Sequence, residues 1–218
     1  MNTMLNRITL SLALPLALIG CATTQMTSMA APEVKGRSFG TVLVIADIAD
    51  LGLRQQAENA FAHSPSTAHS LVCDPICRAA DDARASTVFL AAYAVLFPGR
   101  NYTPMELIAI LAANKIDATL VVTPTAAGTS ESYVPPSYST SCTSWSVTTS
   151  CRTTQSGGVV VERPWATYAA RMFEIRSGRA IWISTASTGG NAFASSSTLI
   201  ESMAEKTLQH LRSDGVVR

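Results

Sequence analysis

The sequence predicts a single-domain α/β sandwich of the α+β kind, in which helices pack on a mixed sheet. Short apolar runs at residues 41–46, 86–91 and 118–122 are typical of strands. Helical patterns separate these runs, and a hairpin followed by a long amphipathic helix ends the chain. The predicted order is therefore β-α-β-α-β, a polar insertion, and then β-β-α.

Capping signals mark the two helices of the first half. Asp50 stands where an N-cap belongs, and apolar residues recur at helical spacing after it. Thr103 and Glu106 form a capping box around Pro104, which is best tolerated at the first helical position. Both helices are therefore predicted from local chemistry as well as from periodicity.

The last part of the chain predicts a hairpin and the longest helix. Segments Ala166–Ile175 and Ala180–Ser187 flank a turn in which Gly178 can supply a positive φ. Apolar residues then recur at i, i+3 and i+4 over Ser196–Ser213. Acidic residues come before basic ones in this segment, which suits the helix dipole.

Residues 124–161 differ from the rest of the chain in composition. Ser and Thr dominate, and Glu131 and Arg152 are the only charged residues among them. We expect an excursion that leaves the sheet and returns through a ribbon closed by a Cys142–Cys151 disulfide, because an isolated ribbon is marginal without such support.

Three aromatic residues, Tyr133, Tyr138 and Trp145, are interleaved in this polar insertion. Tyr and Trp anchor protein interfaces well, so these are candidate partner-binding residues. An exposed loop that covers one sheet edge would explain the same residues. Loops of this length inside a compact domain are more often functional or disordered than neutral.

The amino-terminal segment has the layout of a secretory signal. Arg7 precedes an apolar stretch at 8–19 that is too short to span a bilayer. The stretch ends in Leu18-Ile19-Gly20-Cys21, and the segment resembles the signal of bacterial lipoproteins. The resemblance implies removal of residues 1–20, a diacylglyceryl thioether on Cys21 and an acylated new amino terminus. The alternative is an ordinary secretory signal with a chance cysteine.

The signal also predicts the organisation and location of the mature chain. Residues 21–38 are small and polar, which predicts a flexible tether before a single domain at 39–215. The anchor on Cys21 predicts attachment to a membrane of the bacterial envelope. Ala22 stands where an Asp favours inner-membrane retention, so we expect the outer membrane, with the domain facing the periplasm.

Four cysteines remain after Cys21, an even number that predicts two disulfides in an oxidising compartment. Three pairings are possible. We favour the two local pairs, Cys73–Cys77 and Cys142–Cys151. A crossed pairing would instead join the middle of the chain to the polar insertion.

A metal or thiol-redox site is the alternative reading of the first pair. His69, Cys73 and Cys77 follow one another at four-residue spacing, and thiolate with imidazole suits copper(I) or zinc. Pro75 would break a helix that carried them, and the compartment favours a disulfide. We therefore expect no metal and no cofactor.

The composition and motifs argue against several function classes. A net charge of +1 offers no basic footprint for nucleic acid. The chain has no nucleophile elbow, zinc-protease motif, phosphate-binding loop or dinucleotide fingerprint. We expect a protein that is not an enzyme and has no catalytic residues; a hydrolase with its nucleophile among the many serines is the weakest alternative.

Two segments carry a family resemblance. The hairpin from Thr167 to Trp182 and the strand at 117–122 resemble envelope lipoproteins with an anticodon-binding-domain-like α/β sandwich. That group includes the curli-secretion lipoprotein, the penicillin-binding-protein activator lipoproteins and the amino-terminal domain of TolB. The resemblance covers residues 40–125 and 165–213 and implies the fold. The insertion has no counterpart in those members, so their partners do not carry over.

Arg171 is the odd member of the predicted hairpin, because its neighbours are apolar or small. It is a candidate ligand contact. The alternative is an arginine whose stem packs at a sheet margin while its head reaches solvent.

The sequence as a whole predicts a non-enzymatic envelope interaction or assembly module. We expect it to be anchored to the membrane through Cys21 and to dock a protein or a cell-wall-associated partner through the insertion. The alternative function is a periplasmic metal-binding or thiol-redox protein that uses Cys73, Cys77 and His69.

Overall fold

The computed structural model describes residues 21–34, 37, 39–64, 87–145 and 148–218. In chain order the elements are β1 (Ala22–Ala30), the short 3-10 helix η1 (Pro32–Val34), β2 (Thr41–Ala46), α1 (Leu51–Ala62), β3 (Val88–Ala91), η2 (Ala92–Ala94), α3 (Pro104–Ala113), β4 (Ala118–Val134), β5 (Ser137–Trp145), β6 (Thr148–Ser156), β7 (Val159–Glu174), β8 (Ala180–Gly190) and α4 (Ser196–Ser213).

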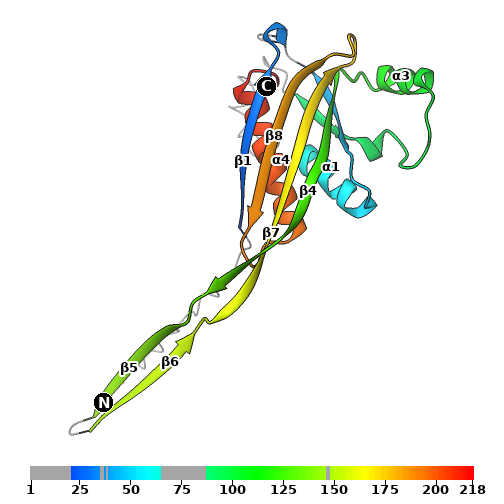
Figure 1. The fold of residues 1–218 in the computed structure, drawn as a ribbon. Coiled ribbons are helices and arrows are strands. Elements are labelled where there is room, and N and C mark those ends of the chain that lie inside the picture. Colours follow the sequence, from blue (N-terminus) through cyan, green and yellow to red (C-terminus); the bar gives the residue numbers. More distant parts are fainter. Residues whose placement is uncertain (1–20, 35–36, 38, 65–86, 146–147) are drawn as a thin grey trace, which may run out of the picture.

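The strands form one large and one small sheet (Figure 1). The large sheet has six strands in the order β1-β8-β7-β4-β2-β3, and β5 pairs with β6 apart from it. β2 runs parallel to β3 and β4, whereas β4, β7, β8 and β1 are antiparallel neighbours. The mixed sheet and the α+β fold class predicted from the sequence are confirmed.

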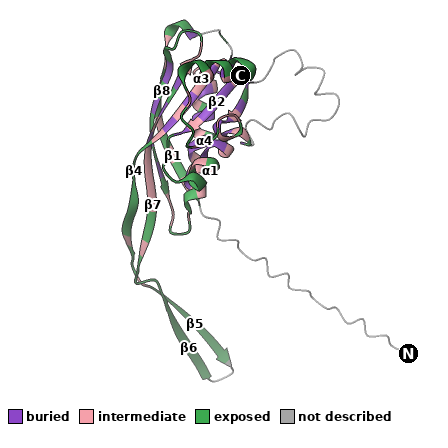
Figure 2. Ribbon diagram, turned by 90° about the vertical axis from the view of Figure 1, so that its right-hand side faces the viewer, coloured by how far each residue is buried: buried purple, intermediate pink, exposed green. Residues whose placement is uncertain are grey.

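Helices α1 and α4 cover one face of the large sheet, and their apolar residues make the main core (Figure 2). Trp182 and Leu120 from the strands pack there with Phe61 of α1 and Leu208 of α4. A smaller core on the other face joins Leu43, Leu111 of α3 and Ile116, among others. The rest of that second face, over β7, β8 and β1, carries exposed side chains, Arg171 among them.

The local signals act as predicted. The Asp50 side chain accepts a hydrogen bond from Leu53 N at 2.8 Å and caps α1. Thr103 and Glu106 close the capping box of α3, and the hydrogen bond from the Thr103 backbone holds the pKa of Glu106 below its usual value. Gly178 has φ +66° in the turn between β7 and β8.

The predicted tether at 21–38 is wrong for most of its length. Residues 22–30 form β1, an edge strand whose nine residues pair in register with β8, and η1 follows. Every second residue, from Ala22 to Ala30, is half-buried against the rest of the domain. The strand depends on hydroxyl pairs as well as apolar contact, and small polar residues alone do not distinguish such a strand from a linker.

The insertion at 124–161 is a ribbon rather than a loop. β4 and β7 continue out of the sheet, and β5 and β6 extend them, so the predicted ribbon is confirmed with longer strands than expected. Within the described residues, no helix combines the length and hydropathy that a membrane crossing needs.

Candidate functional site

Two strands extend well beyond the sheet to which they belong (Figure 1). The pairing of β4 with its parallel neighbour β2 ends at Val122. The pairing of β7 with β8 begins only at Trp165, so the residues of β7 before Trp165 have no contact with β8 in the sheet. β4 and β7 nevertheless stay paired as far as Val134 and Val159. Most residues on this part of the pair are exposed, on both faces, and Ser132, Val161 and Pro164 are half-buried (Figure 2). We call residues 129–164 the projecting ribbon.

A Pro–Gly joint divides the ribbon into two parts. Pro135 and Pro136 interrupt one strand, opposite Gly157 and Gly158 on the other, and the glycines adopt φ +90° and +73°. A Cβ on Gly157 would lie 2.5 Å from the Pro135 carbonyl oxygen, so this close approach requires glycine. Gly158 N donates to Val134 O at 2.8 Å and closes the joint.

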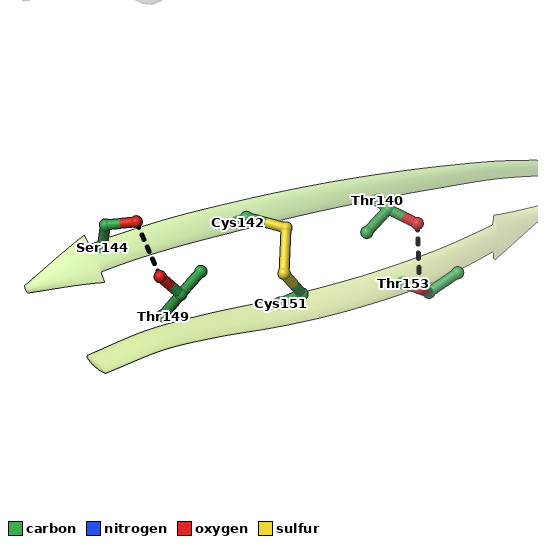
Figure 3. The surroundings of a disulfide bond; sticks show 6 residues. All are labelled: Thr140, Cys142, Ser144, Thr149, Cys151 and Thr153. Atoms are coloured by element: carbon green, nitrogen blue, oxygen red, sulfur yellow. Dashed lines mark hydrogen bonds between the residues drawn. A yellow bond between two sulfur atoms is a disulfide. The ribbon is translucent and has the colours of Figure 1, made fainter. Parts of the chain in front are cut away.

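A disulfide staples the outer part of the ribbon, β5 with β6 (Figure 3). Cys142 and Cys151 are directly paired, and their Cα atoms are 4.0 Å apart. On the same face, hydroxyl pairs flank the disulfide: Thr140 with Thr153 at 2.9 Å and Ser144 with Thr149 at 3.0 Å. The predicted local pair is confirmed, and it holds in shape a hairpin that has no core of its own.

The predicted aromatic residues lie along this ribbon. Tyr133 is 62% exposed before the joint, and Tyr138 is 66% exposed just beyond it. Trp145 is the last residue of β5, opposite Thr148, and its side chain lies outside the described residues. Exposed tyrosines on a stapled ribbon can reach a partner without any rearrangement of the sheet.

Arg171 does not belong to this surface. It pairs with Val121 on β4, whereas Tyr133 pairs with Val160 much further along. The separation of Val121 and Tyr133 corresponds to about 40 Å of extended strand. Arg171 is exposed on the open face of the sheet, which fits an arginine with its head in solvent.

The ribbon also carries a pair of facing glutamates that the sequence alone does not reveal. Glu131 and Glu162 face each other directly across β4 and β7. Like charges in this position repel and weaken the pair. Finding the pair requires the strand register, which the composition does not give.

One cluster of polar side chains in the domain combines a serine, a histidine and an aspartate. The Ser28 hydroxyl donates to Asp214 Oδ2 at 2.7 Å and lies 2.9 Å from His210 Nδ1. Trp182 Nε1 donates to the same carboxylate oxygen at 2.7 Å. Since the only hydroxyl proton goes to Asp214, His210 is the donor to Ser28 and is not placed to act as its base. The cluster therefore ties β1 and β8 to the end of α4.

The alternative metal or redox residues, His69, Cys73 and Cys77, lie outside the described residues, as does the predicted Cys73–Cys77 disulfide. Among the described residues, no group of three or more His, Cys, Asp or Glu side chains is placed to hold a metal ion. Cys21 is exposed at the start of β1, with its carbonyl oxygen 3.0 Å from Asn191 N.

Comparison with known proteins gives similarity to solved structures alone. No family model matches the chain, and no curated protein matches it. A PelC dodecamer from Paraburkholderia phytofirmans is similar at 12% identity, over 90% of this chain and 99% of that chain, with a TM-score of 0.45. Lipoprotein GNA1162 from Neisseria meningitidis is similar at 16% identity, over 80% and 99%, with a TM-score of 0.35. The resemblance to the curli-secretion, penicillin-binding-protein activator and TolB group therefore stays a prediction.

Proposed function

We propose that this protein is a non-enzymatic envelope module that is held on the outer membrane by a lipidated Cys21 and captures a partner with the projecting ribbon. The partner is a protein or a cell-wall-associated component on the periplasmic side. One observation carries this proposal: a stapled, aromatic-bearing ribbon leaves the domain and buries almost nothing against it.

The energetics of the ribbon favour a role in binding. Ordering each backbone residue costs about 1–2 kcal/mol in conformational entropy, and burial of apolar surface normally offsets this cost. All nine described residues of β6 are exposed, so the ribbon gains little from burial. The disulfide and the Pro–Gly joint instead keep it in shape, which suits a surface whose contacts come from another molecule.

The exposed side chains indicate how a partner would be held. Tyr133 and Tyr138 offer large rigid rings with a hydroxyl, and the Ser and Thr ladders offer hydrogen bonds on both faces. The two strands also present open edges to which an extended segment can add. This combination favours recognition of another macromolecule over binding of a small ligand in a pocket.

The test is capture of the partner in intact envelopes. A photo-crosslinking residue in place of Ser141, on β5, should yield a discrete adduct in the acylated protein. The double variant Tyr133→Ser and Tyr138→Ser should lose most of that adduct. Arg171→Ser is the matched control, because it changes an exposed side chain outside the ribbon. Equal loss in the control, or no loss in the tyrosine variant, would place the binding surface elsewhere.

A further inference from the structure

The residue expected to carry the lipid is fixed to the sheet. Asn191 N donates to Cys21 O at 3.0 Å, and Ala22 is the first residue of β1, in register with Gly190. Side chains hold the next residues too: Ser202 Oγ lies 3.4 Å from Ala22 O and 2.8 Å from Thr24 Oγ1. No flexible segment separates Cys21 from the domain.

This placement restricts how far the domain can stand from a bilayer. One residue spans at most about 3.6 Å, so acyl chains on Cys21 bring lipid next to the end of the sheet where β1 begins and β8 ends. A tether of the predicted length would have left the domain free to move away. Because β1 occupies that segment, the same end of the sheet lies at the membrane in every copy.

An exposed aromatic ring lies at this end. Phe193 is 60% exposed in the turn that joins β8 to α4. The turn is ordered by hydrogen bonds from Phe193 N to Asn191 Oδ1 at 3.0 Å and from Ala194 N to Asn191 O at 3.1 Å. Asn191 thus links Phe193 to Cys21, and an aromatic ring beside an acylated residue suits the interface between headgroups and chains.

The ribbon leaves from the same end of the sheet (Figure 1). Strand register aligns Gly128, Trp165, Gly189 and Thr23 across four strands, next to Cys21. Continued by two residues, this register places Ser130 level with Cys21, so the four pairs from Glu131 to Val134 lie beyond the level of the anchor. A lone two-stranded ribbon with open edges cannot enter hydrocarbon, since its backbone groups would lose their hydrogen bonds.

We infer that the domain sits directly on the lipid surface, with Phe193 in the interface and the inner part of the ribbon lying along the membrane. Exposed Tyr133, Val159 and Val160 then rest at headgroup level, where aromatic side chains are favoured, and the contact with the partner falls chiefly to Tyr138 and the outer hairpin. The outer hairpin reaches sideways over the membrane, so the partner it captures is located at the membrane plane. This inference rests on the lipid anchor of the proposed function.

The experiment places the photo-crosslinking residue p-benzoylphenylalanine at one aromatic position at a time. The positions are Phe193, Tyr133 and, as a matched control, Phe97, which is 74% exposed in the connection between η2 and α3. Each full-length acylated protein is reconstituted in vesicles of phosphatidylethanolamine and phosphatidylglycerol. Sedimentation with the vesicles measures anchoring, and mass spectrometry measures the lipid adduct.

All three proteins should sediment, and lipid adducts at positions 193 and 133 should be several-fold above those at position 97. Sedimentation with equal, low adducts at all three positions would overturn the inference and leave the anchor intact. Failure to sediment would overturn the anchor itself, and the inference with it.

A flexible insertion tests whether the position of Cys21 causes the contact. About ten Gly and Ser residues between Cys21 and Ala22 would span roughly 17 Å. The protein should still sediment, but the adduct at position 193 should fall toward the level at position 97. An unchanged adduct would show that attachment of Cys21 to β1 does not determine the orientation.

Discussion

β4 and β7 each belong to two regions that obey different rules. Inside the sandwich, alternate residues such as Leu120 and Val122 are fully buried under α1 and α4. From Pro124 to Glu131 the same strand is exposed on both faces, although its pairing with β7 continues to Val134. The first region is held by burial of apolar side chains and the second by backbone hydrogen bonds. A pair of strands can therefore extend beyond the hydrophobic core that its inner part builds.

The sandwich and the ribbon differ in what they contribute to stability and to binding. The sandwich has the burial that stabilises a fold and, among its described residues, no group of side chains placed to hold a metal ion. The ribbon has little burial and the features of a recognition surface. Changes in the sandwich should therefore alter the free energy of unfolding, and changes in the ribbon should alter capture.

The largest effect is expected at Trp182, which is 1% exposed. Trp182→Ala leaves a large cavity and removes a hydrogen bond to Asp214, so it should lower the free energy of unfolding by about 3–5 kcal/mol. Chemical denaturation measures the change. Tyr138→Ala in the ribbon should change the free energy of unfolding by no more than about 0.5 kcal/mol. A loss as large as that of Trp182→Ala would show that the ribbon and the sandwich unfold as one cooperative unit.

Tyr168 should make the sandwich sensitive to alkali. Burial raises the pKa of Tyr168 from 10.0 to about 12. The raised pKa means that the unfolded chain loses this proton first, so stability is complete below pH 10 and falls as pH rises to about 12. The loss should be about 2–3 kcal/mol. Denaturation at several pH values should show this slope in the wild type and a reduced slope in Tyr168→Phe.

Ser28 tests how firmly β1 is joined to the domain. Ser28→Ala removes hydrogen bonds to Asp214 and His210 and should cost about 1–2 kcal/mol of unfolding free energy. Amide exchange along β1 should accelerate in parallel. Thr27→Ala is the matched control, because Thr27 is exposed on the opposite side of the same strand. Equal effects of the two substitutions would rule out the cluster as the cause.

The smallest effect on global stability is expected from the disulfide. Cys142→Ser with Cys151→Ser removes a staple across a nine-residue separation. The hairpin should exchange amides and be cleaved by proteases faster, while the melting temperature of the domain stays unchanged. A lower melting temperature would show that the outer ribbon stabilises the sandwich.

The sequence predicted those elements whose signals are local or periodic. α4 runs over Ser196–Ser213 as expected, because its apolar stripe follows the helical period. The capping box at Thr103 and the turn at Gly178 also lie where they were predicted. In each case a few neighbouring residues determine the conformation.

Elements that depend on distant partners were not predictable in this way. β1 lacks an apolar run, and its pairing with β8 depends on residues more than one hundred and fifty positions away. The continued pairing of β4 and β7 through the insertion depends on their mutual register, which Ser and Thr do not reveal. The proximity of Phe193 to Cys21 follows only once β1 is known to be a strand.

Deletion of the ribbon from Ser130 to Ser156 tests the central claim most directly. The melting temperature and the capture of the envelope partner would be measured on the same two proteins. Loop-closure entropy changes slowly with length and the ribbon buries little, so the melting temperature should shift by less than about 2 °C. Capture should be lost. A large fall in melting temperature, or capture that survives the deletion, would contradict the division between a stabilising sandwich and a binding ribbon.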